Sequence, residues 1–485
     1  MDDDLTISLP PHVLIFPSPV QCPINTMFDT AELLCLSGLD VTFLLTPYTK
    51  SLLFHYVCID SRLHTYPISP STESHSNHLP SIRLHTISDG LPPDHPQSDA
   101  TELLDSMETF TKPVFKGLFT SGKLVSDECG PVSCIISDGY MTFVYDVANE
   151  LQVPVISALS LSPCSLWVLS NLPDPTKAVE ASNSTRDSVI RRVPGLNGIL
   201  TSGDLASMCQ SSEWTHCTMK HLRKQIIELS RAHGLILNTF KALDGPILSH
   251  IHSICPNLYP IGPIHTHLAV RQEAERLIPL LNYSREENKD CITWLDLQQP
   301  KSVLYVNIEN KVQLEWVQTR ELWHGLVNSG KRFLWVRRAE SILEEGRVPP
   351  KILKGTKERG CIVDSASNVH VLAHKAIGGF LTCGQWDSII QGTVEGVPTI
   401  CCPLSSDQQV NSRFVSKAWK IGLDVEWRWE RNIIEKMVRD VMELKDGLID
   451  NANTKKYSGR KSVRKGGSSY ARLDQLIDDI RCMRH

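Results

Sequence analysis

Two histidines and a cysteine in the C-terminal half of the chain have a spacing that could bind a metal ion. His370 and His374 are four residues apart, which puts both on one face of a helix, and Cys383 follows one predicted strand later. A structural zinc site needs four protein ligands, and this pattern supplies three. We therefore expect structural histidines and no metal.

Cysteine thiols are the candidate nucleophiles. Cys22 lies just before a predicted helix, and a helix N-terminus lowers the pKa of a nearby thiol. Cys383 is a second candidate, although a free cysteine is more often a small buried apolar residue. The chain has 15 cysteines, an odd number that indicates free thiols in a reducing compartment.

Length and composition limit the class of protein. A chain of 485 residues exceeds what one hydrophobic core supports, so two domains are expected. A formal net charge of −5 argues against a protein that coats nucleic acid or an anionic membrane. No segment approaches the ~20 apolar residues of a membrane span, and the acidic first residues do not resemble a signal peptide. We expect a cytoplasmic protein with neither a membrane span nor a nucleic-acid partner.

Apolar runs alternate with helical patterns in two rounds, which predicts an α/β fold. The first round has predicted strands at 12–16, 41–45, 133–137, 154–157 and 235–238. The second round has them at 302–306, 332–336, 360–363, 377–381 and 398–402. Such alternation is typical of doubly wound parallel sheets, here two Rossmann-like domains facing across a cleft that holds the ligands.

The predicted boundaries follow from the polar stretch between the two rounds. The first helix is expected to begin at Asn25 or Thr26 as its N-cap and to end before Gly38. The predicted organisation is an N-terminal domain at 1–258, a linker at 259–290, a C-terminal domain at 291–465 and a C-terminal helix at 466–485 that returns to the first domain.

Several motifs resemble those of plant family-1 UDP-glycosyltransferases. The strongest is GGFLTCGQWDSII, within residues 360–411, and others are PHVLIFPSPVQ at 11–21, CIISDGYMTF at 134–143 and GGSSYARLDQLIDDI at 466–480. Within the family, the chain most resembles the branch that glucosylates iridoids such as 7-deoxyloganetic acid. The resemblance implies the GT-B fold, with an acceptor in the N-terminal domain and a UDP-sugar against the C-terminal one.

The family's catalytic base is missing from this chain. In the family, a histidine after the first strand deprotonates the acceptor hydroxyl, and an aspartate orients it. Pro23 stands at the histidine position, and Asp138 stands at the aspartate position. A positioned base typically contributes ~10²–10⁴ in rate, so the resemblance predicts impaired transfer.

The donor positions also depart from the family. The residues that contact uracil, ribose and diphosphate in the family are replaced here by Ser365, Asn368, Cys383 and Gln391. Two carboxylates, Glu309 and Asp387, are expected beside the diphosphate, where they would repel it or, if buried together, share a proton as an acid/base pair. The family's sugar-pocket residues are kept at Trp386, Asp407 and Gln408. From these replacements we expect weak binding of UDP-sugar.

These departures lead to one expected function and two alternatives. The expectation is a protein that binds a small apolar metabolite of the iridoid or terpenoid class without efficient sugar transfer and without a cofactor. It would be a binder or a donor-independent catalyst of a rearrangement, cyclisation or elimination, with Asp138, Glu309, Asp387 or Cys22 as tentative catalytic residues. One alternative is an O-glucosyltransferase that uses UDP-glucose as co-substrate for an iridoid, terpenoid or phenolic acceptor. The other is a non-catalytic partner of an active relative, and association with other biosynthetic enzymes stays open.

Overall fold

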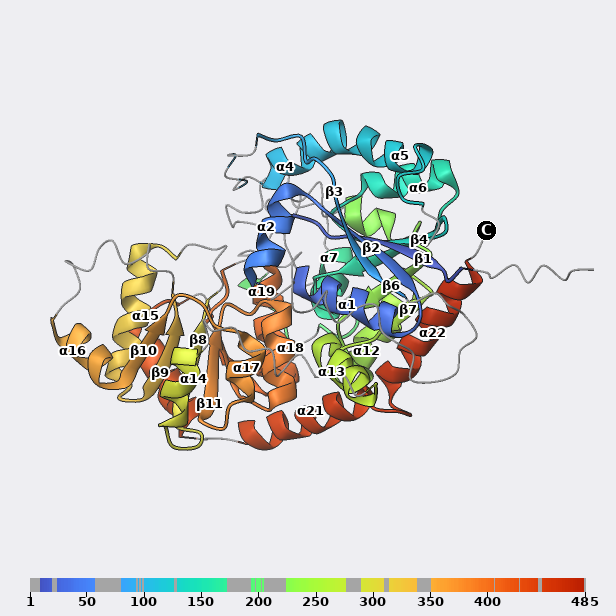
Figure 1. Ribbon diagram of the computed structural model, residues 1–485. Coiled ribbons are helices and arrows are strands. Elements are labelled where there is room, and N and C mark those ends of the chain that lie inside the picture. Colours follow the sequence, from blue (N-terminus) through green and yellow to red (C-terminus); the bar gives the residue numbers. More distant parts are fainter. Residues whose placement is uncertain are drawn as a thin grey trace, which may run out of the picture.

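Two parallel β-sheets covered by helices form the architecture of the protein (Figure 1). The structure is a computed structural model, and it describes residues 9–19, 24–56, 80–92, 95, 97, 100–125, 129–171, 193–196, 198–201, 203–204, 224–275, 289–308, 314–337, 350–404, 406–426, 428–443 and 447–483. The predicted fold class, two doubly wound parallel sheets, is confirmed.

The N-terminal sheet has seven strands in the order β3-β2-β1-β4-β5-β6-β7. The strands are β1 (His12–Phe16), β2 (Asp40–Leu45), β3 (Ile82–Thr86), β4 (Val132–Asp138), β5 (Val155–Leu159), β6 (Gly234–Leu237) and β7 (Leu258–Pro260). The helices are α1 (Ile24–Leu36), α2 (Pro47–Tyr56), α4 (Ala100–Ser106), α5 (Lys112–Thr120), α6 (Phe143–Leu151), α7 (Pro163–Asn171), α12 (Lys241–Ile251) and α13 (Ile264–Ala274). Every residue of β1, β2 and β4 is buried, as helices on both faces of the sheet require.

The C-terminal sheet has six strands in the order β10-β9-β8-β11-β12-β13. They are β8 (Val303–Asn307), β9 (Arg332–Val336), β10 (Gly360–Val363), β11 (Ile377–Thr382), β12 (Thr399–Cys401) and β13 (Gly422–Asp424). Its helices are α14 (Lys289–Asp296), α15 (Trp316–Asn328), α16 (Pro350–Arg359), α17 (Asn368–Ala373), α18 (Trp386–Glu395), α19 (Ser406–Arg413) and α20 (Arg431–Met442).

The strand order reverses between β1 and β4 in one sheet and between β8 and β11 in the other. At such switch points the loops that follow the strands diverge and leave a crevice in which α/β proteins bind ligands. Asp138 ends β4, and Cys383 follows β11 directly. The topology therefore brings predicted site residues of both domains to the two switch points.

Three strands were not predicted from the sequence. They are short or polar: β3 reads IRLHT, β7 reads LYP and β13 reads GLD. Pro260 ends β7 at the edge of its sheet, where a missing N–H is tolerated. Because β7 completes the N-terminal sheet, the predicted boundary at residue 258 falls inside a strand of that sheet.

The start of the first helix differs from the prediction. α1 begins at Ile24, so Asn25 and Thr26 lie inside its first turn and neither is the N-cap residue. The hydroxyl of Thr26 donates instead to Asp387 of the other domain, at 2.8 Å. A tertiary contact has thus replaced the expected capping bond.

The last two helices of the chain lead from the C-terminal domain back to the N-terminal one. After α21 (Leu448–Ser462), α22 (Ser468–Cys482) lies alongside β7 of the N-terminal domain (Figure 1). Leu473, Leu476 and Ile480 are buried in the same cluster as Val13 and Ile15 of β1. The hydroxyl of Tyr259 in β7 donates to Asp479 at 2.7 Å.

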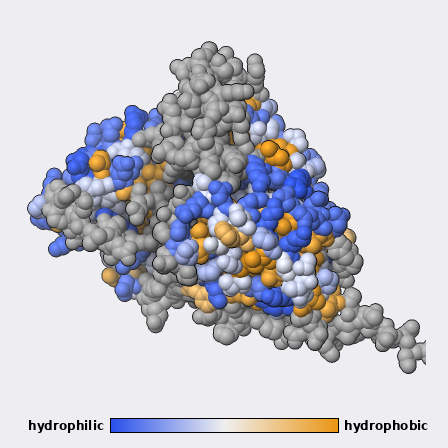
Figure 2. Space-filling view, turned by 90° about the horizontal axis from the view of Figure 1, so that it is seen from above, coloured by the Kyte–Doolittle hydropathy of each residue, from blue (hydrophilic) through white to orange (hydrophobic). Residues whose placement is uncertain are grey.

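The surface mixes apolar and polar residues. In Figure 2 the coloured residues alternate between hydrophilic and hydrophobic over the face that is shown. Within the described residues, no helix has the length and apolar character needed to span a bilayer.

Candidate active site between the two domains

The two domains meet along α18 and α19 on one side and α1, α7 and β6 on the other. One buried apolar cluster crosses this boundary and includes Trp167 and Phe240 from the N-terminal domain and Trp386 and Phe414 from the C-terminal one. The cluster excludes water from the interface and fixes how the ends of the two sheets face each other.

Asp387 ties α18 to the N-terminal domain. One carboxylate oxygen accepts the hydroxyl of Thr26 at 2.8 Å, and the other accepts the side-chain amide of Asn238 at 3.0 Å. Burial raises the pKa of Asp387, although both hydrogen bonds oppose the shift. The indole N–H of Trp386 donates to the carbonyl of Asn238 at 3.0 Å. Both oxygens of Asp387 are therefore bonded across the interface, which was not foreseen for a carboxylate expected to face a diphosphate.

Asp138 is fully buried at the end of β4. One of its oxygens accepts the backbone N–H of Tyr140 at 3.0 Å. Its other oxygen, Oδ2, is buried and has no hydrogen-bond partner among the described residues. Desolvation raises the pKa of Asp138 to about 7.

Asp407 and Gln408 lie at the start of α19, near the N-terminal domain. The carbonyl of Asp407 accepts the hydroxyl of Ser165 in α7 at 3.1 Å. Gln408 is buried, and its amide oxygen accepts the backbone N–H of Leu404 at 2.9 Å. Burial raises the pKa of the Tyr140 phenol, and the charges of Asp407 and Asp138 raise it further. Tyr140 thus connects the surroundings of Asp138 and Asp407.

The predicted donor positions occupy different surroundings. The side-chain oxygen of Asn368 accepts the hydroxyl of Tyr305 and the amide of Asn307, each at 2.7 Å. Ser365 lies half-buried in the loop between β10 and α17. Gln391 lies half-buried on α18, and its buried Oε1 has no partner among the described residues. Gln391 therefore keeps an acceptor oxygen that a ligand hydroxyl could use.

Cys383 and the two histidines do not form a metal site. Cys383 is fully buried in the apolar cluster that contains Ile400, Cys402 and Val425. His374 contacts Asp296 at 3.2 Å and accepts the backbone N–H of Ala376 at 3.2 Å, which is a structural role. Within the part of the chain that the structure describes, no group of three or more candidate ligands could hold a metal ion.

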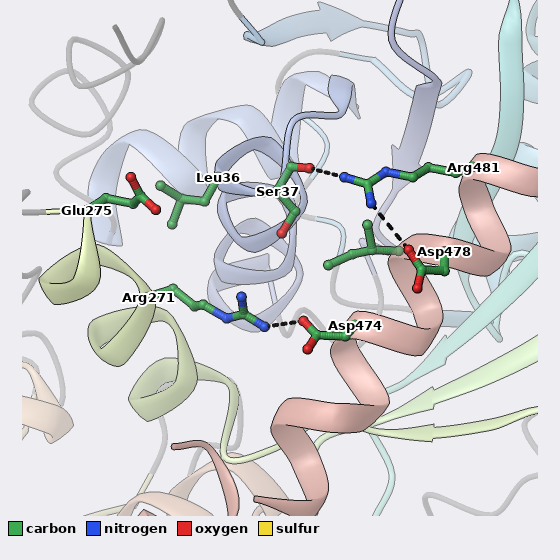
Figure 3. A pocket seen from close by; sticks show the side chains of 8 residues that line it. Leu36, Ser37, Arg271, Glu275, Asp474, Asp478 and Arg481 are labelled. Carbon is green, nitrogen blue, oxygen red and sulfur yellow. Dashed lines mark hydrogen bonds and ion pairs between the residues drawn. The ribbon is translucent and has the colours of Figure 1, made fainter. Parts of the chain in front are cut away.

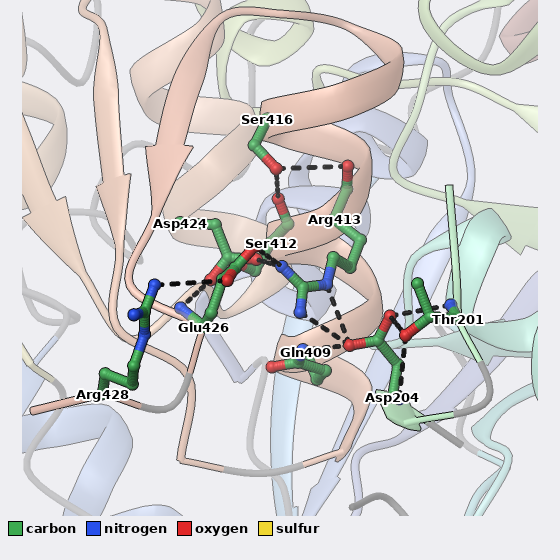
Figure 4. Close-up of polar contacts among 9 residues, drawn as sticks. All are labelled: Thr201, Asp204, Gln409, Ser412, Arg413, Ser416, Asp424, Glu426 and Arg428. Atoms are coloured by element: carbon green, nitrogen blue, oxygen red, sulfur yellow. Dashed lines mark hydrogen bonds and ion pairs between the residues drawn. The ribbon is translucent and has the colours of Figure 1, made fainter. Parts of the chain in front are cut away.

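A buried ion-pair network ties α19 to the N-terminal domain (Figure 4). The guanidinium of Arg413 donates to Asp204 at 2.6 Å and to Asp424 at 2.8 Å. These hydrogen bonds and charges hold the pKa of Asp204 below its usual value in spite of burial. Nearby, the side-chain oxygen of Asn411 accepts the hydroxyl of Ser162 at 2.5 Å, and its amide donates to the carbonyl of Gly384 at 3.0 Å.

Some predicted residues lie outside the described residues. They are Cys22, Pro23 and Glu309, together with most of the residues in 67–98 and 172–215, where we expect acceptor specificity to lie. Their predicted roles stay predictions.

A separate cavity of about 370 Å³ lies at the other end of α1 (Figure 3). It is lined by Leu36, Ser37, Arg271, Glu275, Asp474, Ile477, Asp478 and Arg481. Ten residues of helix, about 15 Å, separate Leu36 from Thr26, so this cavity is not part of the interdomain site. Two ion pairs, Arg271 to Asp474 at 2.5 Å and Arg481 to Asp478 at 3.2 Å, occupy its walls.

The sequence did not reveal several residues of the interface. Asn238 and Tyr140 stand just beyond the ends of strands, a position that could have marked them as candidates. Thr26 was expected only as a helix cap, and Asp204 and Arg413 gave no local signal, because their partners are distant in the sequence, by 209 residues for Asp204 and Arg413.

Comparison with known proteins identifies the family. Residues 312–443 match the sequence profile described as UDP-glucoronosyl and UDP-glucosyl transferase. The chain is 39% identical, over 98% of its length and 98% of the relative's, to a Catharanthus roseus protein named 7-deoxyloganetic acid glucosyl transferase. It is also 33% identical, over 97% of the chain and 96% of the relative, to a Crocosmia x crocosmiiflora protein named myricetin 3-O-rhamnoside 1,2-glucosyltransferase UGT709G2.

The fold has close counterparts among solved structures. One is a UDP-glucose:anthocyanidin 3-O-glucosyltransferase in complex with UDP, with a TM-score of 0.77 and 24% identity over 97% of this chain and 98% of the other. Another is UGT71G1 of Medicago truncatula complexed with UDP-glucose, with a TM-score of 0.74 and 24% identity over the same shares. At this identity the likeness shows the GT-B fold.

These relatives correct the expected function. The expectation of a metabolite binder or donor-independent catalyst without efficient sugar transfer is wrong, because the full-length relatives are named as glucosyltransferases. A degenerate donor site, inferred from single replacements, finds no support in these relatives or in the structure. Both carboxylate oxygens of Asp387 accept hydrogen bonds at the domain interface. Identity along nearly the whole chain shows that it belongs to the plant family-1 UDP-glycosyltransferases.

Proposed function

We propose that this protein is a UDP-glucose-dependent O-glucosyltransferase whose acceptor is a small apolar iridoid. The main support is the 39% identity over 98% of the chain to two Catharanthus roseus proteins named for glucosyl transfer to 7-deoxyloganetic acid. Two further relatives, 30% and 31% identical, are named 7-deoxyloganetin glucosyltransferases.

The geometry of α18 and α19 supports donor binding in the interdomain site. Gln391 offers an unpaired acceptor oxygen on α18, which we assign to a ribose hydroxyl. Asp407 is partly exposed at the start of α19, where we assign it, with Gln408, to the sugar. Because Asp387 is bonded to Thr26 and Asn238, its charge is directed toward the domain interface rather than left unpaired beside the diphosphate.

The proposed reaction changes two bonds at the anomeric carbon and one at the acceptor oxygen. The acceptor oxygen forms a bond to the anomeric carbon of glucose, the bond from that carbon to the β-phosphate oxygen breaks, and UDP leaves with the electron pair. The acceptor hydroxyl loses its proton as its oxygen attacks. The apolar interface around Trp386 and Phe240 keeps water from competing for the sugar.

Donor binding and product formation test this proposal together. Titration calorimetry with UDP and UDP-glucose should give micromolar affinity, about −8 kcal/mol. Incubation with UDP-glucose and 7-deoxyloganetic acid should give a product heavier by one glucosyl unit in mass spectrometry, and omission of UDP-glucose is the control.

Two results would contradict the proposed function. One is an affinity for UDP-glucose weaker than millimolar. The other is micromolar donor binding without a glucoside from a panel of iridoids, other terpenoids and phenols, which would leave a nucleotide-binding protein with another reaction.

A further inference from the structure

Asp138 differs from other buried carboxylates of this protein in its hydrogen bonds. Asp244 accepts Thr239 on one oxygen at 2.5 Å and the thiol of Cys164 on the other at 3.4 Å. Asp204 likewise has partners on both oxygens. By contrast, Oδ2 of Asp138 is buried and has no partner among the described residues. Buried polar atoms are nearly always hydrogen-bonded, so this oxygen calls for an explanation.

Among the described residues, no cation lowers the pKa of Asp138. Gln225 approaches the backbone at Gly139, and its buried Oε1 also has no partner among the described residues. Burial raises the pKa of the Tyr145 phenol in α6, Ser157 of β5 opposes the rise, and the charge of Asp138 adds to it. A buried carboxylate oxygen without a partner suits a ligand or water that carries a hydroxyl proton.

The position of Asp138 connects it with the sugar side of the site. Tyr140 is two residues beyond Asp138. Its burial raises the pKa of its phenol, and the charges of Asp407 and Asp138 add to this rise. Asp407 belongs to α19 of the C-terminal domain. The same tyrosine therefore lies within electrostatic reach of a carboxylate from each domain.

We propose that Oδ2 of Asp138 accepts the proton of the acceptor hydroxyl, directly or through one water molecule. This inference rests on the proposed function. The O–H bond of the acceptor breaks as its oxygen bonds to the anomeric carbon, UDP leaves with the electron pair of the broken C–O bond, and the proton resides on Asp138. The carboxyl group then returns the proton to solvent when the products leave.

The ionisation of Asp138 suits this role. Burial raises its pKa to about 7, and the N–H of Tyr140 is the contact that opposes the rise. The polar groups around it are Tyr140 after β4, Tyr145 of α6, Ser157 of β5 and Gln225, with Asp407 beyond Tyr140. A base whose pKa lies near the working pH combines availability with driving force for proton transfer.

The test uses the full chain with UDP-glucose and 7-deoxyloganetin, the compound for which two of the relatives are named. Wild-type kcat/KM should rise with pH and level off above about 7, because the base must be ionised. Asp138→Asn should lower kcat by about 10²–10⁴-fold, remove the rise with pH and leave the affinity for UDP in calorimetry within a few fold. Asp244→Asn is the matched control: it removes another buried carboxylate with a raised pKa and should keep both the rate and the pH profile.

Asp138→Glu separates chemistry from folding. It keeps a carboxylate, so its activity should exceed that of Asp138→Asn and retain a rise with pH. The inference is overturned if wild-type kcat/KM is independent of pH between about 5.5 and 8.5, or if Asp138→Asn keeps the wild-type rate. If the wild type binds no UDP-glucose and forms no glucoside, the proposed function falls and this inference with it.

Discussion

At the scale of single residues, two of the buried oxygens that have no partner among the described residues belong to predicted site residues. Oε1 of Gln391 lies on the donor side, and Oδ2 of Asp138 lies at the end of β4 in the N-terminal domain. Because an unpaired buried acceptor costs about 1–3 kcal/mol, each is expected to gain a partner when substrates bind.

Substitution of Gln391 tests its contact with the donor. Gln391→Glu adds a second acceptor oxygen and a charge, and a charged hydrogen bond contributes roughly 1.5–3 kcal/mol. We expect the KM for UDP-glucose to fall about tenfold. Gln391→Leu, of similar size without an acceptor, should raise this KM by a similar factor in steady-state kinetics. An unchanged KM in both variants would show that Gln391 does not touch the donor.

The raised pKa of Asp138 also makes a prediction about stability. Its folded-state pKa of about 7 exceeds the usual value of 3.8, so its contribution to stability is full below pH 3.8 and is lost as the pH rises through 7. Asp138→Asn has no such loss. We expect the melting temperature of the variant, relative to wild type, to increase from pH 5 to pH 8 in scanning calorimetry. A constant difference over that range would mean that Asp138 titrates normally.

At the scale of elements, close backbone packing explains why β11, a central strand of the C-terminal sheet, contains glycine. A Cβ atom on Gly378 in β11 would lie 2.3 Å from the carbonyl oxygen of Lys301. The register between β8 and β11 shifts at this point, between Ile377 and Gly379. The strand beside the switch point therefore needs a residue without a side chain.

A pair of glycine-to-alanine changes tests this packing. Gly378→Ala should lower the free energy of unfolding by about 1–3 kcal/mol, because backbone atoms must move apart. Gly117→Ala, inside α5 with no atom within 4 Å of the added carbon, should raise it by about 0.5–1 kcal/mol. Urea unfolding of both variants measures the two changes, and equal signs would refute the argument.

At the scale of the whole molecule, polar contacts between distant segments hold the two domains in register. Asp387 joins α1 and the residue after β6 to α18, Arg413 joins Asp204 to α19, and Asn411 joins α7 to α19. α22 adds a further connection by packing on the N-terminal core. A transferase with donor and acceptor on different domains depends on these contacts for the distance between them.

Loss of Arg413 should weaken this connection. Arg413→Ala leaves Asp204 and Asp424 buried without their cation, and breaking a buried ion pair costs about 3–5 kcal/mol. We expect a lower melting temperature and a separation of the calorimetric transition into two. Arg428→Ala removes an exposed ion pair with Glu426 and should change stability by less than 1 kcal/mol. Equal effects of the two variants would contradict a role for the buried network.

The parts of the fold with long apolar runs could be predicted, and the short edge strands could not. β1, β2 and β4 are buried throughout, so their residues form continuous apolar patterns. β13 has three residues and is identified by its pairing with β12, which involves a different part of the chain. The site divides similarly, since Asp138 was found from a motif, whereas Asn238 became visible through its bond to Asp387.

The sequence alone determined the alternation of strands and helices, the family and the identities of the residues that replace the family's catalytic and donor groups. Tertiary structure alone decided what those replacements do: Asp387 bonds across the interface to Thr26, 361 residues away, and Asp138 keeps an unpaired oxygen in a buried site. The physical reason is how far apart along the chain the interacting residues lie. Strand and helix patterns arise from neighbours along the chain, whereas the charge, burial and partners of a side chain depend on elements that the fold brings together.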